Sequence, residues 1–165
     1  MSERNTVLRS MYDIGLAAWF GGSLMGAVGL NGAAAQVNNP TERLRIASAG
    51  WERWVPVNLA AIAAHVVGAT GILASQSPRV AAQKGVDAMS VVKTALTAAA
   101  LGVTVYSRLV GKEMEKADGV PVEGVTEPAP STPEDVSAAQ RQQRLAQWVI
   151  PAFTGALLVV SSLAP

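Results

Sequence analysis

The stretch VPVNLAAIAAHVVGATGILA, residues 55–74, decides the fold class of this chain. Its twenty residues contain no charge. As a helix rising about 1.5 Å per residue they would cover about 30 Å, the hydrocarbon thickness of a bilayer. His65, the single histidine of the chain, lies near the middle of the stretch. An ionisable group at that depth is costly unless it faces protein or water, so His65 is by default a candidate for a functional site.

Three further apolar stretches have a similar length, at residues 14–35, 88–110 and 145–164. Half of the 165 residues are apolar and 15% are charged, against about 25% in soluble proteins. The pattern shows no strand-like alternation, and the length suits one domain. We therefore predict an all-α fold, an integral membrane four-helix bundle with an up-down-up-down course, in which residues 1–165 form a single membrane domain.

The connectors between these stretches differ in composition. Residues 36–54 are polar and end with Trp51 and Trp54, as in the aromatic belt at a membrane interface, and a short interfacial helix is predicted there. Residues 118–131 are rich in proline, glycine and acids, which predicts a flexible linker. The stretch 14–35 is longer than the apolar region of a signal peptide, which favours a retained helix over a cleaved leader.

Basic residues predict the orientation of the bundle. In a chain with four spans, both termini share a side with the loop between the second and third spans. That side carries Arg4, Arg9, Arg79 and Lys84. The opposite side carries Arg43, Arg45, Arg53, Arg108, Lys112, Lys116, Arg141 and Arg144. The positive-inside rule therefore predicts termini outside the cell and residues 111–132 in the cytoplasm.

Small residues at helical spacing predict where helices touch. Gly22 and Gly26 form a small-xxx-small pair in the first stretch, and Ala60, Ala64 and Gly68 recur at every fourth residue of the second. Helices in lipid associate through such faces because small residues let two backbones approach closely. Both faces are predicted helix contacts, but the spacing does not indicate which helix lies opposite.

Topology also suggests one buried ion pair. The first and third spans begin on the same side, so Asp13 and Lys93 are expected at comparable depth. A lysine within the bilayer is stabilised by a carboxylate, and Asp13 is the acid near the start of the first span. The alternative is that Lys93 extends its long side chain to the lipid headgroups.

His65 has three interpretations on the residues alone. It is a neutral imidazole hydrogen-bonded across the bundle, a metal or haem ligand, or a proton-relay or quinone-contact residue. In the copper version of the second interpretation, Met25 of the first span supplies a soft thioether ligand. The cores of the four stretches contain no acid, no cysteine and no second histidine that would orient or complete such a site.

The patterns that support catalysis do not occur in this sequence. The chain has no cysteine, which excludes disulfides, thiolate metal sites and cysteine nucleophiles. It contains no phosphate-binding glycine loop, no HExxH motif and no G-x-S-x-G motif, and its formal net charge of +1 gives no reason to expect nucleic acid as a partner. A further alternative is a passage for a small neutral solute, lined by Asn31, Asn58, Thr97 and Thr104.

Three short motifs occur within residues 10–110: Trp19-Phe20-Gly21-Gly22, Thr70-Gly71, and Val92-Lys93 followed by Arg108. Together they resemble the copper-resistance D-type membrane domain and its uncharacterised bacterial relatives. The resemblance implies a four-helix unit that is associated with copper handling or has no assigned role. The chain departs from a copper protein in its single histidine and in its scattered methionines, Met11, Met25, Met89 and Met114.

Taken together, these features predict a small multi-pass protein of the bacterial plasma membrane that is surrounded by lipid and is not an enzyme. Its small-residue faces indicate a subunit or accessory protein that has no cofactor and forms a homo-oligomer or joins a larger membrane complex. The alternative function is binding or handling of copper or haem through His65.

Overall fold

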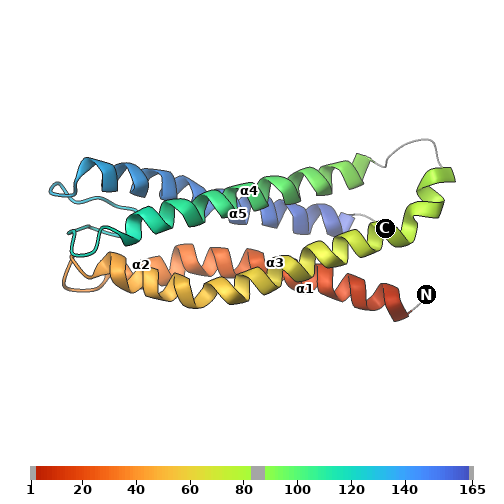
Figure 1. Ribbon diagram of the computed structural model, residues 1–165, viewed down its shortest axis with the longest axis horizontal. Coiled ribbons are helices and arrows are strands. Elements are labelled where there is room, and N and C mark those ends of the chain that lie inside the picture. The colour runs from red at the N-terminus through yellow and green to blue at the C-terminus, as the bar shows by residue number, and fades with distance from the viewer. Residues whose placement is uncertain (1–2, 83–87, 164–165) are drawn as a thin grey trace.

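The computed structural model describes residues 3–82 and 88–163, and Figure 1 shows four long helices lying side by side. In chain order the elements are α1 (Glu3–Met25), the π-helical turn η1 (Gly26–Leu30), α2 (Asn31–Ala35), α3 (Arg43–Ala82), α4 (Ala88–Glu115) and α5 (Glu134–Leu163). No strand forms among the described residues, although an isolated bridge pairs Val122 with Pro128. The predicted all-helical fold is confirmed.

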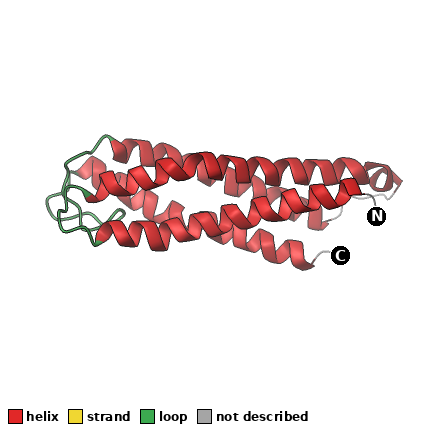
Figure 2. Cartoon of the chain, turned by 90° about the horizontal axis from the view of Figure 1, so that it is seen from below, coloured by secondary structure: helices red, strands yellow, loops and turns green. Residues whose placement is uncertain are grey.

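The four long helices pack as two pairs. α1 lies mainly against α3, α4 lies mainly against α5, and contacts between α1 and α5 join the pairs. α3 and α4 make few contacts with each other. The described chain ends lie at one end of the bundle in Figure 1, and Figure 2 shows the connecting segments 36–42 and 116–133 gathered at the opposite end.

Four helical runs are long and apolar enough to cross a membrane: Thr6–Ala35, Arg43–Ser75, Ala88–Glu115 and Glu134–Leu163. Each of them contains most or all of one apolar stretch singled out in the sequence. The first run is continuous through α1, η1 and α2, with the π turn inserted between two α-helical parts. By length and composition, the prediction of four long apolar helices is therefore confirmed.

The polar connector differs from the prediction, because no separate interfacial helix forms within residues 36–54. α3 begins at Arg43 and continues without a break past Trp51 and Trp54. Pro56 lies inside α3, where it removes one backbone donor without ending this helix. With 40 residues, α3 is about 60 Å long. The predicted interfacial segment is thus the first part of a helix longer than the hydrocarbon layer.

Glycines let the backbones of α1 and α3 come into direct contact. A Cβ atom on Gly15 would overlap the carbonyl oxygen of Ala61 and lie 2.6 Å from the backbone nitrogen of His65. A Cβ atom on Gly68 would lie 2.6 Å from the carbonyl oxygen of Leu8. Neither position has room for a side chain, so this contact requires glycine on both helices.

The predicted glycine pair, Gly22 of α1 and Gly26 of η1, packs against aromatic rings instead of another small-residue face. A Cβ atom on Gly22 would overlap the indole of Trp54, and one on Gly26 would overlap the indole of Trp51. The two tryptophans of α3 therefore occupy the space that the two glycines leave open. In the sequence these tryptophans indicate a membrane interface, whereas in the fold their rings pack against α1.

The predicted ridge on the second stretch lies one residue away from the face that touches α1. Ala60 is exposed and Ala64 is half-buried, whereas Ala61, His65 and Gly68 are buried. Gly68 contacts α1, as predicted for a helix-contact residue, whereas Ala60 does not face α1. Successive residues turn by about 100° around a helix, so His65 and Gly68 place Ala61 rather than Ala60 on the inner face.

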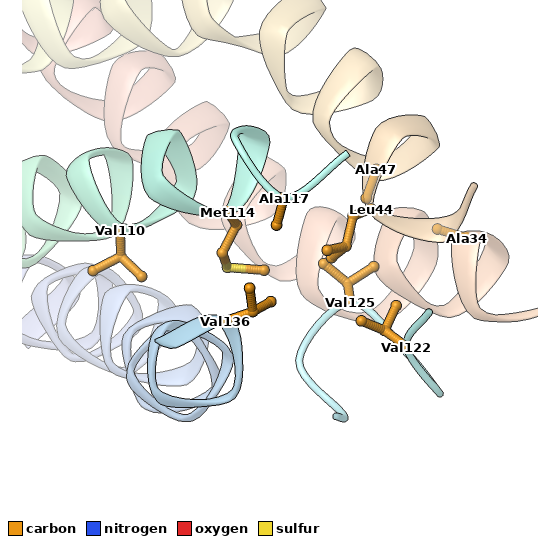
Figure 3. Packing of buried hydrophobic residues seen from close by; sticks show 9 residues of the cluster. All are labelled: Ala34, Leu44, Ala47, Val110, Met114, Ala117, Val122, Val125 and Val136. Atoms are coloured by element: carbon orange, nitrogen blue, oxygen red, sulfur yellow. The ribbon is translucent and has the colours of Figure 1, made fainter. Parts of the chain in front are cut away.

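The predicted flexible linker, residues 118–131, is instead folded onto the end of the bundle. Val122 is fully buried and Val125 is 5% exposed. Figure 3 shows both side chains in one cluster with Leu44 of α3 and Met114 of α4. The correction has a physical reason: two well-spaced valines supply the apolar surface that the proline- and acid-rich composition obscures. We call residues 116–133 the cap.

Hydrogen bonds hold the cap to two helices. The Gln140 side-chain amide of α5 donates to the carbonyl oxygens of Gly124 and Val125, at 3.0 and 3.1 Å. The Arg43 guanidinium of α3 donates to the carbonyl oxygen of Val122 at 3.0 Å. These bonds satisfy cap carbonyl groups that would otherwise lose water on burial.

Val122→Asp is expected to open the cap. An ionised carboxylate in place of a fully buried valine carries a large desolvation penalty, so we expect proteinase K to cleave the cap at least about tenfold faster. Glu123→Ala is the matched control, because the neighbouring Glu123 is exposed. The cleavage rate is measured by electrophoresis of the detergent-purified protein. Equal rates for wild type and Val122→Asp would contradict the buried cap.

Candidate functional site

His65 lies where α3 approaches α1 most closely, and it is fully buried. Its Nδ1 atom lies 3.1 Å from the carbonyl oxygen of Tyr12, and its Nε2 atom lies 3.4 Å from the hydroxyl of Thr97 on α4. A carbonyl oxygen only accepts hydrogen bonds, so Nδ1 donates to Tyr12, and in a neutral imidazole Nε2 then accepts from the Thr97 hydroxyl. His65 thus bridges three helices, α1, α3 and α4.

Aromatic rings complete the surroundings of His65. The rings of Tyr12 and Trp19 lie 4.4 and 6.2 Å from the imidazole, measured between centroids. The Tyr12 hydroxyl is 2.7 Å from the Ser161 hydroxyl of α5, and Trp19 Nε1 donates to Thr104 of α4 at 3.2 Å. His65 therefore belongs to a polar and aromatic cluster that connects all four long helices.

Met25 does not meet His65. It lies 13 residues after Tyr12 on the same α-helix, which corresponds to about 20 Å along the axis. Its side chain is 65% exposed. Across the part of the chain that the structure describes, no group of three or more His, Asp or Glu side chains is arranged to hold a metal ion. The structure thus brings no second ligand to His65.

Asp13 and Lys93 are also not joined. None of the ion pairs among residues 3–82 and 88–163 contains either side chain. Asp13 is exposed and Lys93 is half-buried. The neighbouring Tyr12 turns toward His65, and a rotation of about 100° per residue then directs Asp13 away from the bundle. The predicted buried ion pair is wrong.

A cavity of about 120 Å³ with a mixed polar and apolar lining lies among the four long helices, in the half of the bundle nearer to the cap. Three indole rings line it, those of Trp19, Trp51 and Trp54. The other lining side chains include eight uncharged polar ones: Ser23, Asn31, Ser48, Asn58, Thr104, Ser107, Gln143 and Gln147. Three of the four residues proposed from sequence for a solute passage are in this lining, and the fourth, Thr97, contacts His65 instead.

Part of the cavity wall is an ordered chain of hydrogen bonds. Asn31 accepts from Trp51 Nε1 at 3.0 Å and donates to Gln147 at 2.9 Å. Gln147 donates in turn to the Thr126 hydroxyl of the cap at 3.3 Å. Asn31 and Gln147 are almost fully buried. The chain ties α2, α3, α5 and the cap together and gives the wall a fixed shape.

Two other lining residues keep unused acceptors. The Gln143 amide donates to Ser107 at 2.8 Å, but its Oε1 atom is buried without a hydrogen-bond partner. The Oδ1 atom of Asn58 is buried without a partner as well. Leaving a buried carbonyl oxygen unpaired costs about 1–3 kcal/mol. Two residues of the lining therefore each contain a buried amide oxygen without a hydrogen bond.

A charged cluster lies beside the cavity, where α3 and α4 make few contacts. Arg108 of α4 lines the cavity and pairs with Glu52 of α3 and with Glu115, the latter at 3.0 Å. Lys112 also acts electrostatically on Glu52, so two cations balance the two carboxylates. Arg108 thus bridges two helices that otherwise make few contacts with each other.

Much of this cavity wall was not identified as a site from the sequence. The signal in α5 was the spacing of Gln140, Gln143 and Gln147, which places three amides on one helical face. The signal in α4 was Arg108 seven residues before Glu115, again on one face. The partner of Arg108 on α3, Glu52, could be recognised only once the tertiary structure had brought the helices together.

Comparisons with protein-family models, with curated proteins and with solved structures found no match to this chain. The resemblance of its short motifs to the copper-resistance D-type domain therefore stays a prediction. The site is defined by its own geometry: a buried histidine cluster that connects the helices, and beside it a cavity lined by indole rings, other apolar side chains and uncharged polar side chains.

Proposed function

We propose that this chain is a multi-pass membrane protein whose four long helices cross the bilayer in an up-down-up-down course. The exposure of large apolar side chains supports this, because a bundle in water buries such residues. Ile14 of α1 is 69% exposed, Leu59 of α3 is 62% exposed, and Val105 of α4 is 60% exposed. Lipid is the surrounding that accommodates these surfaces without penalty.

Within the membrane, we propose that the protein acts as a non-catalytic subunit that associates with a second copy through α4. The observation that carries this is the outer face of α4, since only 6% of the most apolar window of this helix is buried. Exposed residues at alternating spacings of three and four form one stripe along it: Val91, Ala95, Ala98, Gly102, Val105 and Leu109. Nothing lies within 4 Å of a Cβ atom placed on Gly102.

Gly102 differs from the glycines that serve the fold of one chain. Gly15 and Gly68 each face a neighbouring backbone, whereas Gly102 faces open space. Because helices in lipid associate through small residues, an unused small-residue face supports a contact with another chain. The plasma membrane of a bacterium is the proposed location, with the cap end in the cytoplasm as the distribution of basic residues indicates.

Cysteine cross-linking tests the association. The chain has no cysteine, so Ala98→Cys gives a single thiol on the proposed interface. Oxidation in native membranes is expected to convert most of this variant into a disulfide-linked dimer. Leu59→Cys, on an exposed position of α3, is the control and should stay monomeric. A monomeric Ala98→Cys protein, or equal cross-linking of both variants, would contradict self-association through α4.

Reporter fusions test the orientation separately. A fusion after Pro165 is expected to report an extracytoplasmic C-terminus, and an insertion after Glu123 in the cap is expected to report the cytoplasm. The opposite result at both positions would reverse the proposed orientation while leaving the four spans intact. Reporters on one common side in a soluble fraction would contradict the membrane assignment itself.

Copper or haem binding through His65 is the alternative function, and its support is the resemblance and the chemistry of imidazole. The geometry favours it less than the subunit, because both ring nitrogens already have hydrogen-bond partners within the chain. A ligand role would require His65 to release Thr97. Stoichiometric copper, or a Soret band that disappears in His65→Ala, would establish this alternative.

A further inference from the structure

The cavity among the four long helices has the size of a small ring. Its volume is about 120 Å³, somewhat below the roughly 150 Å³ of an engineered cavity that binds benzene. The cavity is also partly open, so a bound ring does not have to be enclosed on every side. It therefore has room for a molecule with one six-membered ring.

Three indole rings form fixed walls of the cavity, those of Trp19, Trp51 and Trp54. A Cβ atom on Gly26 would overlap the indole of Trp51, so this ring fills the space beside the glycine. The indole of Trp54 packs in the same way against Gly22. The Nε1 atoms of Trp19 and Trp51 also donate hydrogen bonds within the chain. Because the rings are held in place beforehand, little conformational freedom is lost when a guest binds against them.

The hydrogen-bonding groups of the lining are mostly used within the chain. Gln143 donates to Ser107 at 2.8 Å, and Asn31 donates to Gln147 at 2.9 Å. The hydroxyl of Ser23 donates to a carbonyl oxygen of its own helix at 2.9 Å. The lining therefore presents mainly apolar surface to a guest, which favours a molecule that needs few hydrogen bonds.

The charged side chains at the cavity favour a neutral guest. Arg108 and Glu115, which line the cavity, pair with each other at 3.0 Å. Glu52 also pairs with Arg108, and Lys112 acts electrostatically on Glu52, so the two cations balance the two carboxylates. A charged guest would lose hydration without finding an unpaired counter-charge, and this loss is costly in an apolar site.

We propose that this cavity binds a small, neutral aromatic molecule with a single ring. Edge-to-face and offset-stacked contacts with the three indoles favour an aromatic ring over a saturated ring of similar size. The route of entry is the side between α3 and α4, because these helices make few contacts with each other and both contribute to the lining. This inference does not depend on association through α4, and a monomer suffices for it.

Fluorine NMR with a matched set of compounds tests the selectivity on the full chain in detergent. Fluorobenzene is the neutral aromatic probe, and fluorocyclohexane is its saturated counterpart. The ions para-fluorobenzoate and para-fluorobenzylammonium place a negative or a positive charge on the same ring. We expect a saturable shift with fluorobenzene, at an affinity at least about tenfold above those of the two ions and about two- to tenfold above that of fluorocyclohexane. Absence of a saturable shift with fluorobenzene, or equal affinity for any of the other three compounds, would overturn the proposal.

Ser23→Leu separates binding in the cavity from partitioning into the detergent micelle. Ser23 lines the cavity, and its hydroxyl donates to the carbonyl oxygen of Phe20 in the same helix. The larger leucine fills part of the cavity, so the affinity for fluorobenzene should fall at least about tenfold while the circular dichroism spectrum stays unchanged.

Ser162→Leu is the matched control for this variant. The hydroxyl of Ser162 also donates to a carbonyl oxygen three residues earlier, and this residue is exposed on α5, outside the lining. Its replacement should leave the affinity for fluorobenzene unchanged. Unchanged affinity in Ser23→Leu, or the same loss in Ser162→Leu, would place the guest outside the cavity and overturn the assignment.

Trp54→Leu tests the aromatic wall without filling the cavity. The indole of Trp54 packs against Gly22, and leucine keeps an apolar side chain at this position. We expect fluorobenzene to bind about two- to tenfold more weakly, and fluorocyclohexane to change less. Trp148→Leu is the control, because it removes an indole that is 50% exposed on α5 and should leave both affinities unchanged.

The result for Trp54→Leu decides the proposal even if Ser23→Leu does not fold. An equal loss of affinity for fluorobenzene and fluorocyclohexane, or no loss for either, would show that the indoles do not select an aromatic guest and would overturn the proposal. Either result has this meaning also when Ala98→Cys still forms dimers. Conversely, selective binding of fluorobenzene supports the proposal even if Ala98→Cys stays monomeric.

Discussion

Gly15→Ala is expected to destabilise the protein by about 2–3 kcal/mol, because overpacking a close contact costs about this much when the neighbours cannot move. The new Cβ atom would overlap the carbonyl oxygen of Ala61 and lie 2.6 Å from the backbone nitrogen of His65. Both neighbours are backbone atoms of a long helix. Only a separation of α1 from α3 would relieve the overlap, and it would loosen the packing around His65.

Gly21→Ala provides the matched control on the same helix. Nothing lies within 4 Å of a Cβ atom at Gly21, so the higher helix propensity of alanine is retained and the change stays within about 1 kcal/mol. Unfolding is followed by circular dichroism in detergent at increasing denaturant. If the two alanine variants shift the midpoint equally, the close contact between α1 and α3 does not exist.

His65→Ala is expected to cost about 3–5 kcal/mol of unfolding free energy, as for other large buried side chains cut back to alanine. The ring is fully buried, and it is packed against Tyr12 and Trp19. Its removal leaves a cavity at the point where the helices meet. It also leaves the Thr97 hydroxyl without its partner. Loss of packing and loss of a hydrogen bond therefore act in the same direction.

A double-mutant cycle separates these two effects. His65→Phe retains most of the volume but strands the Thr97 hydroxyl, whereas the double variant with Thr97→Val removes both partners. The double variant should be more stable than the sum of the single changes predicts, with a coupling of about 1 kcal/mol. An additive result would mean that His65 and Thr97 do not interact. Unchanged stability of His65→Ala would reject the structural role and favour a ligand role.

The apolar pattern of the sequence was enough to locate the helices, but it did not predict the residues at which they begin and end. The four stretches correspond to four long helices, but α3 begins at Arg43, twelve residues before the stretch 55–74. Polar residues continue a helix readily when no breaker intervenes. Hydropathy reports where a helix is apolar and gives no information on how far it extends into polar surroundings.

The cap shows why composition gave a wrong prediction of a flexible linker at residues 118–131. Proline, glycine and acidic residues are typical of mobile linkers, yet Val122 and Val125 anchor this segment in a cluster with Leu44 and Met114. Two valines can hold the cap against the bundle only because the end of the bundle offers them an apolar surface. That surface is assembled from α3, α4 and α5, which no local pattern describes.

The candidate site divides in the same way. Asn31, Asn58 and Thr104 were recognisable as polar residues within apolar helices, and all three line the cavity. Gln143, which also lines the cavity, comes from a further helix, α5. Which of these residues meet depends on the rotation of each helix about its axis. The same rotation explains why Ala61, and not the predicted Ala60, faces α1.

By itself, the sequence determined the helical class, four apolar helices and a place for the single histidine within one of them, because a run of about 20 apolar residues matches the hydrocarbon thickness when it is helical. The tertiary structure alone decided which glycines meet backbones, that Met25 and His65 lie far apart, and that a cavity remains beside the histidine cluster. Those features depend on differences of a few ångströms in the distances between helices. Small residues allow several such distances, so the sequence does not specify them before the bundle packs.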